Sequence, residues 1–156
     1  MLNIMGKKKK LREVANYREE LFKNPQLRQL FLELTLRCNE KCLHCGSSCG
    51  DVKSEELSPE QYKTFLTQIK EDFGTQDKML CITGGEPLLR SDFFDIMSGA
   101  NELGFNWGMT SNATLIDDSV AKELYNCGMK TISVSIDGLE DTHDAFRRTP
   151  GGYKKA

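Results

Sequence analysis

The chain has 156 residues, 38% of them hydrophobic and 28% charged, and its net charge is −2 at pH 7. These are the proportions of an ordinary globular domain, so they exclude intrinsic disorder, and no stretch reaches the ~20 apolar residues that cross a bilayer. The length suits one domain with a modest core. The one basic run, residues 7–10, is interpreted as a solvated tail, so we expect neither a nucleic-acid nor a membrane partner.

The cysteines indicate a reducing compartment. Four of the six lie between Cys38 and Cys49, too close together for a disulfide framework that spans a domain. Reduced thiolates that bind a metal fit this spacing better. Because residues 1–6 are too short for the apolar region of a secretion signal, we expect a cytoplasmic location.

The first half of the chain is expected to form a helix, a strand and a second helix. Apolar residues at helical spacing predict a helix over residues 11–22, which a proline at position 25 ends. Alternation with period two predicts a strand over residues 30–36. The sequence Ser58-Pro59-Glu60-Gln61 is typical of a capped helix start, and Gly74 is typical of a helix end.

The second half repeats a strand–helix unit. Strands are expected at residues 79–82, 105–110 and 131–136, and helices at 91–103 and 117–127. Short strands that alternate with longer helices predict right-handed βαβ units, and therefore one parallel sheet of four strands with three intervening helices. The fourth strand has no next neighbour in this sequence, so we expect the chain to stop inside a domain.

The strongest chemical signal is the C-x3-C-x2-C run formed by Cys38, Cys42 and Cys45, directly after the first strand. Active sites of parallel α/β folds lie at this end of the strands. Three thiolates within eight residues are able to hold three corners of a [4Fe-4S] cube, and one iron then stays open for a further ligand.

Two other interpretations of these cysteines remain open on spacing alone. A structural zinc site would stabilise a binding module, although such sites usually use two pairs of ligands. A ferredoxin-like electron carrier would use Cys49 as a fourth ligand. We expect Cys49 to be a loop thiol, and we expect Cys81, Cys127 and Trp107 to be core residues.

A second signal follows the second strand, in the sequence Thr83-Gly84-Gly85-Glu86-Pro87. Paired glycines let the backbone approach a ligand closely, and the glutamate is able to accept hydrogen bonds from an ammonium group. Alone, such a loop is more often a tight turn between a strand and a helix. Its position after the cysteine run makes it informative.

Together the two motifs resemble the radical S-adenosylmethionine (SAM) superfamily, and the resemblance extends from residue 30 to about residue 153. It implies an enzyme in which Cys38, Cys42 and Cys45 hold a [4Fe-4S] cluster that binds SAM. Reductive cleavage of SAM would give a 5′-deoxyadenosyl radical that abstracts hydrogen from a substrate. The resemblance also implies a reductant partner such as flavodoxin or ferredoxin.

The resemblance further implies a set of cofactor-binding residues, some with a structural alternative. His44 would lie beside the adenine, or be a stray loop histidine or an occasional metal ligand. Ser111 and Asn112 would contact the ribose or the carboxylate of SAM, or only cap the next helix. The remaining candidates are Gly84, Gly85 and Glu86 at the amine, Ser135 and Asp137 on one face of the fourth strand near the ribose, and Arg147 (with Arg148 as its rival) at a carboxylate.

The family also implies the fold, which is α/β: half of a triose-phosphate-isomerase-type (TIM-type) barrel with about four parallel strands, truncated at its C-terminal side. We expect residues 1–29 to form an N-terminal helical extension and residues 30–156 to form the incomplete core. The motif order is similar to the subgroup that modifies peptides or proteins and matures cofactors, in which a C-terminal (SPASM-type) extension carries additional clusters. A peptide or protein substrate is therefore expected.

Overall fold

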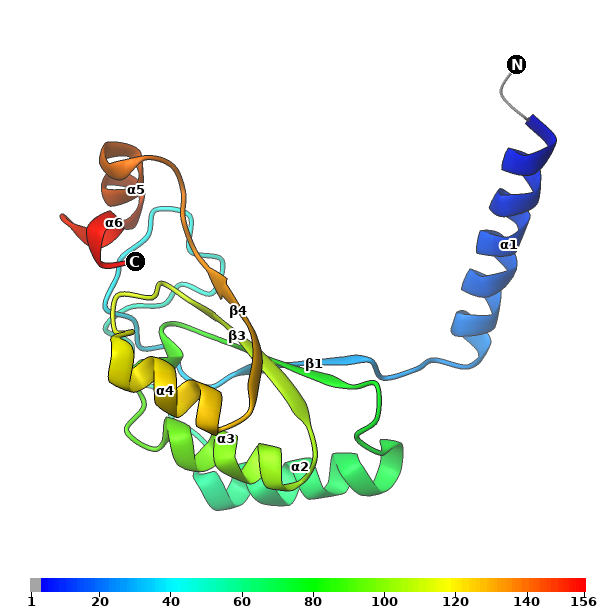
Figure 1. Cartoon of the computed structure of the whole chain (residues 1–156), viewed down its shortest axis with the longest axis horizontal. Helices are drawn as coiled ribbons and strands as arrows, with labels where there is room; N and C mark the ends of the chain where they lie inside the picture. The colour runs from blue at the N-terminus through cyan, green and yellow to red at the C-terminus, as the bar shows by residue number, and fades with distance from the viewer. Residues whose placement is uncertain (1–3) are drawn as a thin grey trace.

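A computed structural model describes residues 4–156, and its centre is one parallel sheet (Figure 1). The four strands follow one another in the order β1-β2-β3-β4. Their bounds are Gln29–Glu33 (β1), Met79–Thr83 (β2), Asn106–Ser111 (β3) and Met129–Val134 (β4). The predicted α/β fold, a partial barrel of four parallel strands, is therefore confirmed.

The helices that connect the strands cover one face of the sheet (Figure 1). They are α2 (Pro59–Phe73), α3 (Phe93–Glu102) and α4 (Asp118–Asn126), and the short 3-10 helix η1 (Pro87–Leu89) precedes α3. Two further helices, α5 (Glu140–Arg147) and α6 (Gly152–Lys155), follow β4, while α1 (Ile4–Lys23) extends away from the sheet.

The hydrophobic core lies between the sheet and these helices. Alternate strand residues point into it, and the strand register places Leu80 beside both Leu30 and Trp107. Trp107 is fully buried, and its indole Nε1 donates a hydrogen bond to the Cys127 carbonyl oxygen at 2.9 Å. The expected core position of Trp107 is thus confirmed. Cys81 and Cys127 are half-buried rather than buried, with Cys127 packed against the edge of the core.

Two of the predicted strands have ends that differ by more than one residue. The strand predicted over residues 30–36 ends at Glu33, and beyond it the carbonyl oxygens of Thr35 and Arg37 accept hydrogen bonds from the loop after β2. The strand predicted over residues 131–136 runs over Met129–Val134, so Ser135 and Asp137 lie in the loop after β4 and not on the strand.

Helix α5 is absent from the sequence prediction. Its N-cap residue is Leu139, which makes no side-chain capping bond, so the usual sequence signal of a helix start is missing. Its last turn is followed by Arg148 in the left-handed conformation, a position usually taken by glycine.

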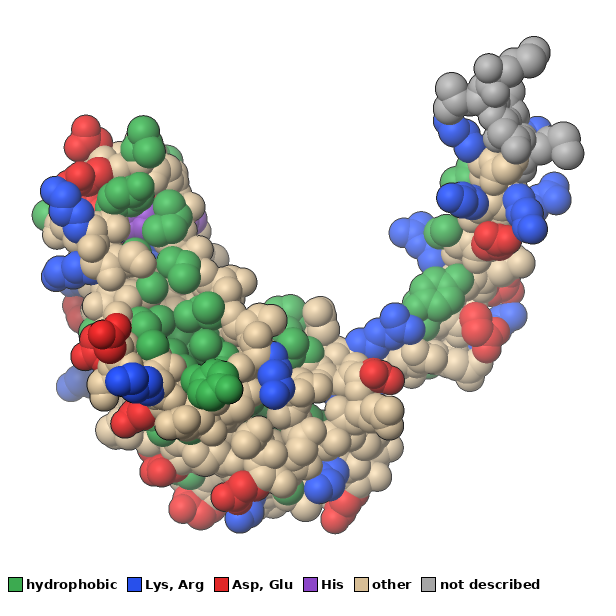
Figure 2. All heavy atoms as spheres, viewed as in Figure 1, with side chains coloured by type: hydrophobic (Ala, Val, Ile, Leu, Met, Phe, Trp, Pro, Cys, Tyr) green, Lys and Arg blue, Asp and Glu red, His purple; other side chains and the backbone are tan. Residues whose placement is uncertain are grey.

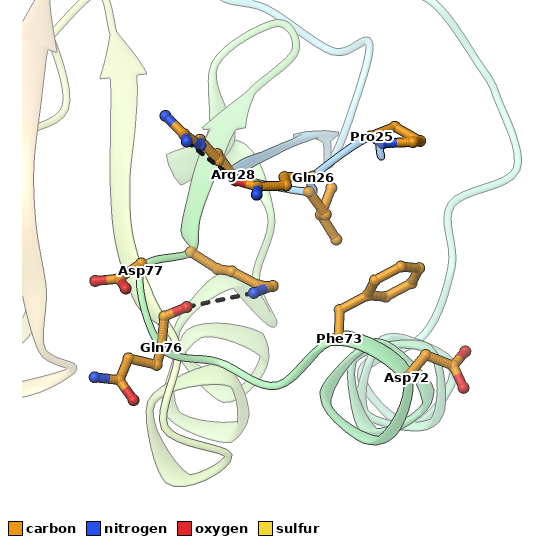
Figure 3. A pocket seen from close by; sticks show the side chains of 9 residues that line it. Pro25, Gln26, Arg28, Asp72, Phe73, Gln76 and Asp77 are labelled. Carbon is orange, nitrogen blue, oxygen red and sulfur yellow. Dashed lines mark hydrogen bonds between the residues drawn. The ribbon is translucent and has the colours of Figure 1, made fainter. Parts of the chain in front are cut away.

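A cavity of about 700 Å³ lies at the amino ends of β1 and β2 (Figure 3). It is formed by residues that precede β1, such as Pro25 and Arg28, and by the end of α2 and the turn after it, including Phe73 and Asp77. No predicted site residue lines it.

Helix α1 carries basic side chains on its surface (Figure 2). It begins earlier than the predicted residue 11, and its contact with the following chain includes the Arg28 guanidinium, 5.9 Å from the centre of the Tyr17 ring. In the described part of the chain, no helix has the length and apolar character that crossing a membrane requires. The division at residue 29 stays a prediction.

The capping box of α2 gives a direct test of the predicted helix start. The Gln61 backbone N–H donates to the Ser58 hydroxyl at 3.3 Å, and the Ser58 N–H donates to Gln61 Oε1 at 2.8 Å. We expect Ser58→Ala to lower the free energy of unfolding by about 1 kcal/mol in urea denaturation. Ser54→Ala, in an exposed loop, is the control, and equal stability of the two variants would contradict the capping role.

Candidate functional site

Loops from the carboxyl ends of all four strands line one cavity of about 210 Å³. Parallel strands present their carboxyl ends at one edge of the sheet, so loops far apart in sequence meet there. Ten of the twelve predicted site residues line this cavity: Cys38, Cys42, His44, Cys45, Gly84, Gly85, Ser111, Asn112, Ser135 and Arg147. The other two, Glu86 and Asp137, lie behind its wall and hold lining residues in place, as described below.

The environments of the three thiols differ. Burial raises the pKa of Cys38, and burial also raises the pKa of Cys42 to about 11. The pKa of Cys45 is lowered, chiefly because the Cys49 backbone N–H donates to its sulfur at 3.3 Å. Cys45 is therefore the thiol that most easily becomes a thiolate. Within residues 4–156, no three His, Cys, Asp or Glu side chains are arranged as ligands of a single metal ion.

Cys49 also lines the cavity, beside Cys45. Burial raises the pKa of its thiol to about 12, and the nearby sulfur of Cys45 acts in the same direction. Its thiol is thus much less acidic than that of Cys45, although both belong to one turn of the loop.

The two glycines after β2 allow two backbone segments to touch. The Gly85 N–H donates to the Thr35 carbonyl oxygen at 2.7 Å, and the Glu86 N–H donates to the Arg37 carbonyl oxygen at 2.9 Å. A Cβ atom on Gly84 would collide with the Thr35 carbonyl oxygen, and one on Gly85 would collide with that of Arg37. The glycine pair therefore fixes the start of the cysteine loop, in addition to forming part of the cavity wall.

Glu86 is fully buried and faces the loop after β3. Its carboxylate accepts hydrogen bonds from the Ser111 hydroxyl at 3.0 Å, the Asn112 N–H at 2.9 Å and the Leu88 N–H at 3.3 Å. Burial raises the pKa of this carboxyl group, against the opposing effect of these donors. In this arrangement Glu86 positions the two predicted residues Ser111 and Asn112, and its expected role toward an ammonium group stays a prediction.

Asn112 connects the β3 loop to the cysteine loop. Its amide nitrogen donates to Asn39 Oδ1 at 2.7 Å and lies 4.0 Å from the Cys38 sulfur. Asn39 in turn donates to the Thr114 hydroxyl at 2.8 Å. Asn39, the residue after Cys38, is therefore held in place by side chains of the loop after β3.

The structure distinguishes Arg147 from Arg148. Arg147 is buried and lines the cavity, whereas Arg148 is exposed. Arg147 Nε donates to Asp137 Oδ2 and Arg147 Nη1 donates to Glu40 Oε2, both at 2.7 Å. Asp137 also lies 3.5 Å from His44 Nε2, so it joins the predicted histidine and arginine from outside the cavity lining.

Glu40 is a site residue that sequence reasoning did not find. It lines the cavity and is fully buried between the first two cysteines of the motif. Its partner Arg147 lies 107 positions away in the sequence. Since no local pattern links positions so far apart, the position of Glu40 inside the cysteine motif was the only available signal.

The close approach at Gly85 leads to a stability prediction. We expect Gly85→Ala to lower the free energy of unfolding by about 1–3 kcal/mol, because the new methyl group forces the Arg37 backbone away. Gly99→Ala is the matched control, since a Cβ there meets nothing within 4 Å and alanine favours the helix. Thermal or urea unfolding measures both, and a Gly85→Ala protein as stable as Gly99→Ala would contradict the packing role.

Several other proteins are similar to this chain in amino-acid sequence. Over 124 residues it is 36% identical to Fe-coproporphyrin III synthase of Methanosarcina barkeri, covering 79% of this chain and 30% of the relative. Over 125 residues it is 34% identical to the sporulation killing factor maturation protein SkfB of Bacillus subtilis, covering 80% of this chain and 30% of the relative. The chain thus spans about a third of the length of these relatives.

Solved structures share the fold. Native anSMEcpe with bound AdoMet superposes with a TM-score of 0.68 at 25% identity, over 83% of this chain and 38% of that one. Streptococcus suis SuiB bound to its precursor peptide SuiA also has a TM-score of 0.68, at 18% identity, over 92% of this chain and 33% of that one.

The model of one family, described as the radical SAM superfamily, matches residues 32–156. Members of this family are enzymes that use a [4Fe-4S] cluster and SAM, so the match confirms the expected family and, at that level, the expected cofactors. The chain belongs to the radical SAM superfamily.

Proposed function

We propose that the protein of which this chain is part cleaves SAM reductively at a [4Fe-4S] cluster and uses the product to abstract hydrogen from a substrate. The observation that carries the proposal is the common cavity: three cysteines, the glycine pair and the polar ends of β3 and β4 all line it. The ferredoxin-like and zinc alternatives do not account for the glycine and β4 walls of this cavity.

The residues present fit such a cluster. Three thiols from one loop line the cavity together, and thiolate is the usual ligand of iron–sulfur clusters. Cys38, Cys42 and Cys45 would hold three irons. When bound, the cluster and SAM supply the electron transfer and bond cleavage that the protein's own side chains cannot perform.

The remaining lining residues would bind and orient SAM. Nε and Nη1 of Arg147 are bonded to carboxylates, and its guanidinium lines the cavity, where it would donate to a SAM carboxylate. Ser135 lines the same cavity as the glycine pair, and its N–H donates to the Ser111 carbonyl oxygen at 3.0 Å. Its backbone is thus joined to the end of β3, and its hydroxyl would contact the ribose. His44 lies beside Phe146, with ring centres 5.7 Å apart, and these two rings would lie on the adenine side of SAM.

We infer a peptide or protein as the substrate, and the 34% identity to the peptide-maturation protein SkfB supports it. A tetrapyrrole precursor of an iron porphyrin is the second candidate, because the relative that is 36% identical over 124 residues is a synthase whose named product is Fe-coproporphyrin III. The proposed electron donor is flavodoxin or ferredoxin, and the proposed location is the cytoplasm, where the thiols stay reduced.

Anaerobic reconstitution of the full-length protein tests this function. With dithionite and SAM we expect formation of 5′-deoxyadenosine, detected by chromatography and mass spectrometry. A reducible cluster without SAM cleavage would instead support an electron carrier, and a colourless zinc protein would support a binding module. Adding candidate peptides or iron-containing tetrapyrrole precursors and measuring the change in 5′-deoxyadenosine yield separates the two substrate classes.

Cys49 provides a sharper test of the ligand set. We expect Cys49→Ala to keep the iron content and the absorbance of the reconstituted wild type, because three thiolates suffice to hold the cluster. Cys45→Ala is the matched change in the same turn, and we expect it to lose most of the cluster. Iron analysis and visible absorbance measure both variants. Loss of the cluster in Cys49→Ala would show a fourth ligand.

A further inference from the structure

The carboxylate of Glu40 is buried inside the loop that carries the cysteines. Its side chain is fully inaccessible, with Oε2 2.7 Å from Arg147 Nη1 and 3.8 Å from the Cys42 sulfur. Its other oxygen, Oε1, has no hydrogen-bond partner in the described structure. A buried carboxylate is costly unless it is paired, so the contact with Arg147 decides whether this loop conformation is stable.

The same part of the loop is joined to α5 through its backbone. The Lys41 N–H donates to the Arg147 carbonyl oxygen at 3.2 Å, and the Leu43 N–H donates to the Phe146 carbonyl oxygen at 2.8 Å. These carbonyls belong to the last turn of α5, where the helix itself leaves them without partners. One ion pair and two backbone bonds therefore join residues 40–43 to the end of α5.

The end of α5 is also held by contacts outside the cysteine loop. Arg147 Nε is bonded to Asp137, and His143 Nδ1 accepts a hydrogen bond from the Asp137 N–H at 3.3 Å. Both Asp144 oxygens accept backbone N–H bonds from the segment that leads into α6. Thus α5 is the fixed partner, and the cysteine loop is the segment that it positions.

We propose that Glu40 is a positioning residue of the iron–sulfur site: its carboxylate fastens the loop that carries Cys42 to Arg147, and α5 thereby sets where Cys42 stands relative to Cys38 and Cys45. The inference rests on the proposed function, because it concerns the same cysteines. The loop has little apolar anchoring of its own, as Leu43 is 58% exposed. The directional contacts with α5 take the place of that anchoring.

Amide hydrogen exchange on the full-length apo protein, kept reduced without air, tests directly whether Glu40 fastens the cysteine loop to α5. The variants are Glu40→Ala, which removes the carboxylate, and Glu40→Gln, which keeps its shape and one acceptor oxygen. Glu55→Gln, an exposed glutamate of the following loop, is the control. We expect exchange at Lys41 and Leu43 to be at least about tenfold faster in Glu40→Ala, intermediate in Glu40→Gln and unchanged in the control.

Iron binding then tests the consequence for the site. At limiting iron we expect Glu40→Ala to bind the cluster roughly tenfold more weakly than the wild type, with partial rescue in Glu40→Gln and an altered electron paramagnetic resonance spectrum of the reduced cluster. If exchange at Lys41 and Leu43 in Glu40→Ala stayed within twofold of the wild type, the claim that Glu40 fastens the loop to α5 would be wrong. Faster exchange with unchanged iron affinity would overturn the positioning role.

The two proposals fail in different ways. If the wild-type protein binds no iron–sulfur cluster, the proposed function fails whatever the exchange rates are. If the wild type assembles the cluster and cleaves SAM but Glu40→Ala does so with equal iron affinity, only the role of Glu40 is wrong. Glu40→Gln, nearly isosteric with the native residue, keeps the test valid where the alanine variant does not fold.

Discussion

The pairing of β1 with β2 does not stop where the two strands end, and the candidate site depends on that continuation. Beyond the last paired residues, the Leu34 N–H still donates to the Thr83 carbonyl oxygen at 3.1 Å, and Gly85 and Glu86 donate to Thr35 and Arg37. Side chains at positions 84 and 85 would push the two segments apart. Because Cys38 follows Arg37 directly, the hydrogen-bond register of the sheet sets the position of the first cysteine.

The loop after β2 also supports the loop after β3, through a different kind of contact. The buried Glu86 carboxylate accepts hydrogen bonds from Ser111 and Asn112 at the end of β3 and from Leu88 in its own loop, so it joins these two segments. The backbone N–H groups of Gly85 and Glu86 bond to the segment after β1, and the Glu86 side chain bonds to the end of β3. A burial that raises the carboxyl pKa is tolerated because three donors satisfy the group.

Short-range sequence patterns predicted much of this architecture. They could not predict contacts between residues that lie far apart in the sequence. The start of α2 was evident because Ser58 and Gln61 lie three residues apart, and the cysteine and glycine motifs were evident because each occupies one loop. The pairing of Glu40 with Arg147 crosses 107 positions, and α5 begins at an uncapped leucine, so neither leaves a periodic or capping pattern. The position of Asp137 behind the cavity wall depends on that same helix.

The contacts that the sequence did not predict are ion pairs of the buried Arg147 side chain, and the composition of the cysteine loop explains why charge is used there. The segment between Cys38 and Cys45 has a single aliphatic side chain, Leu43, and it points largely into solvent, so apolar packing cannot hold the segment. An ion pair gains little net free energy after desolvation, but its geometry is demanding, and breaking it leaves a buried charge unpaired. Arg147, placed between Glu40 and Asp137, therefore restricts the loop to one arrangement where hydrophobic contact would allow several.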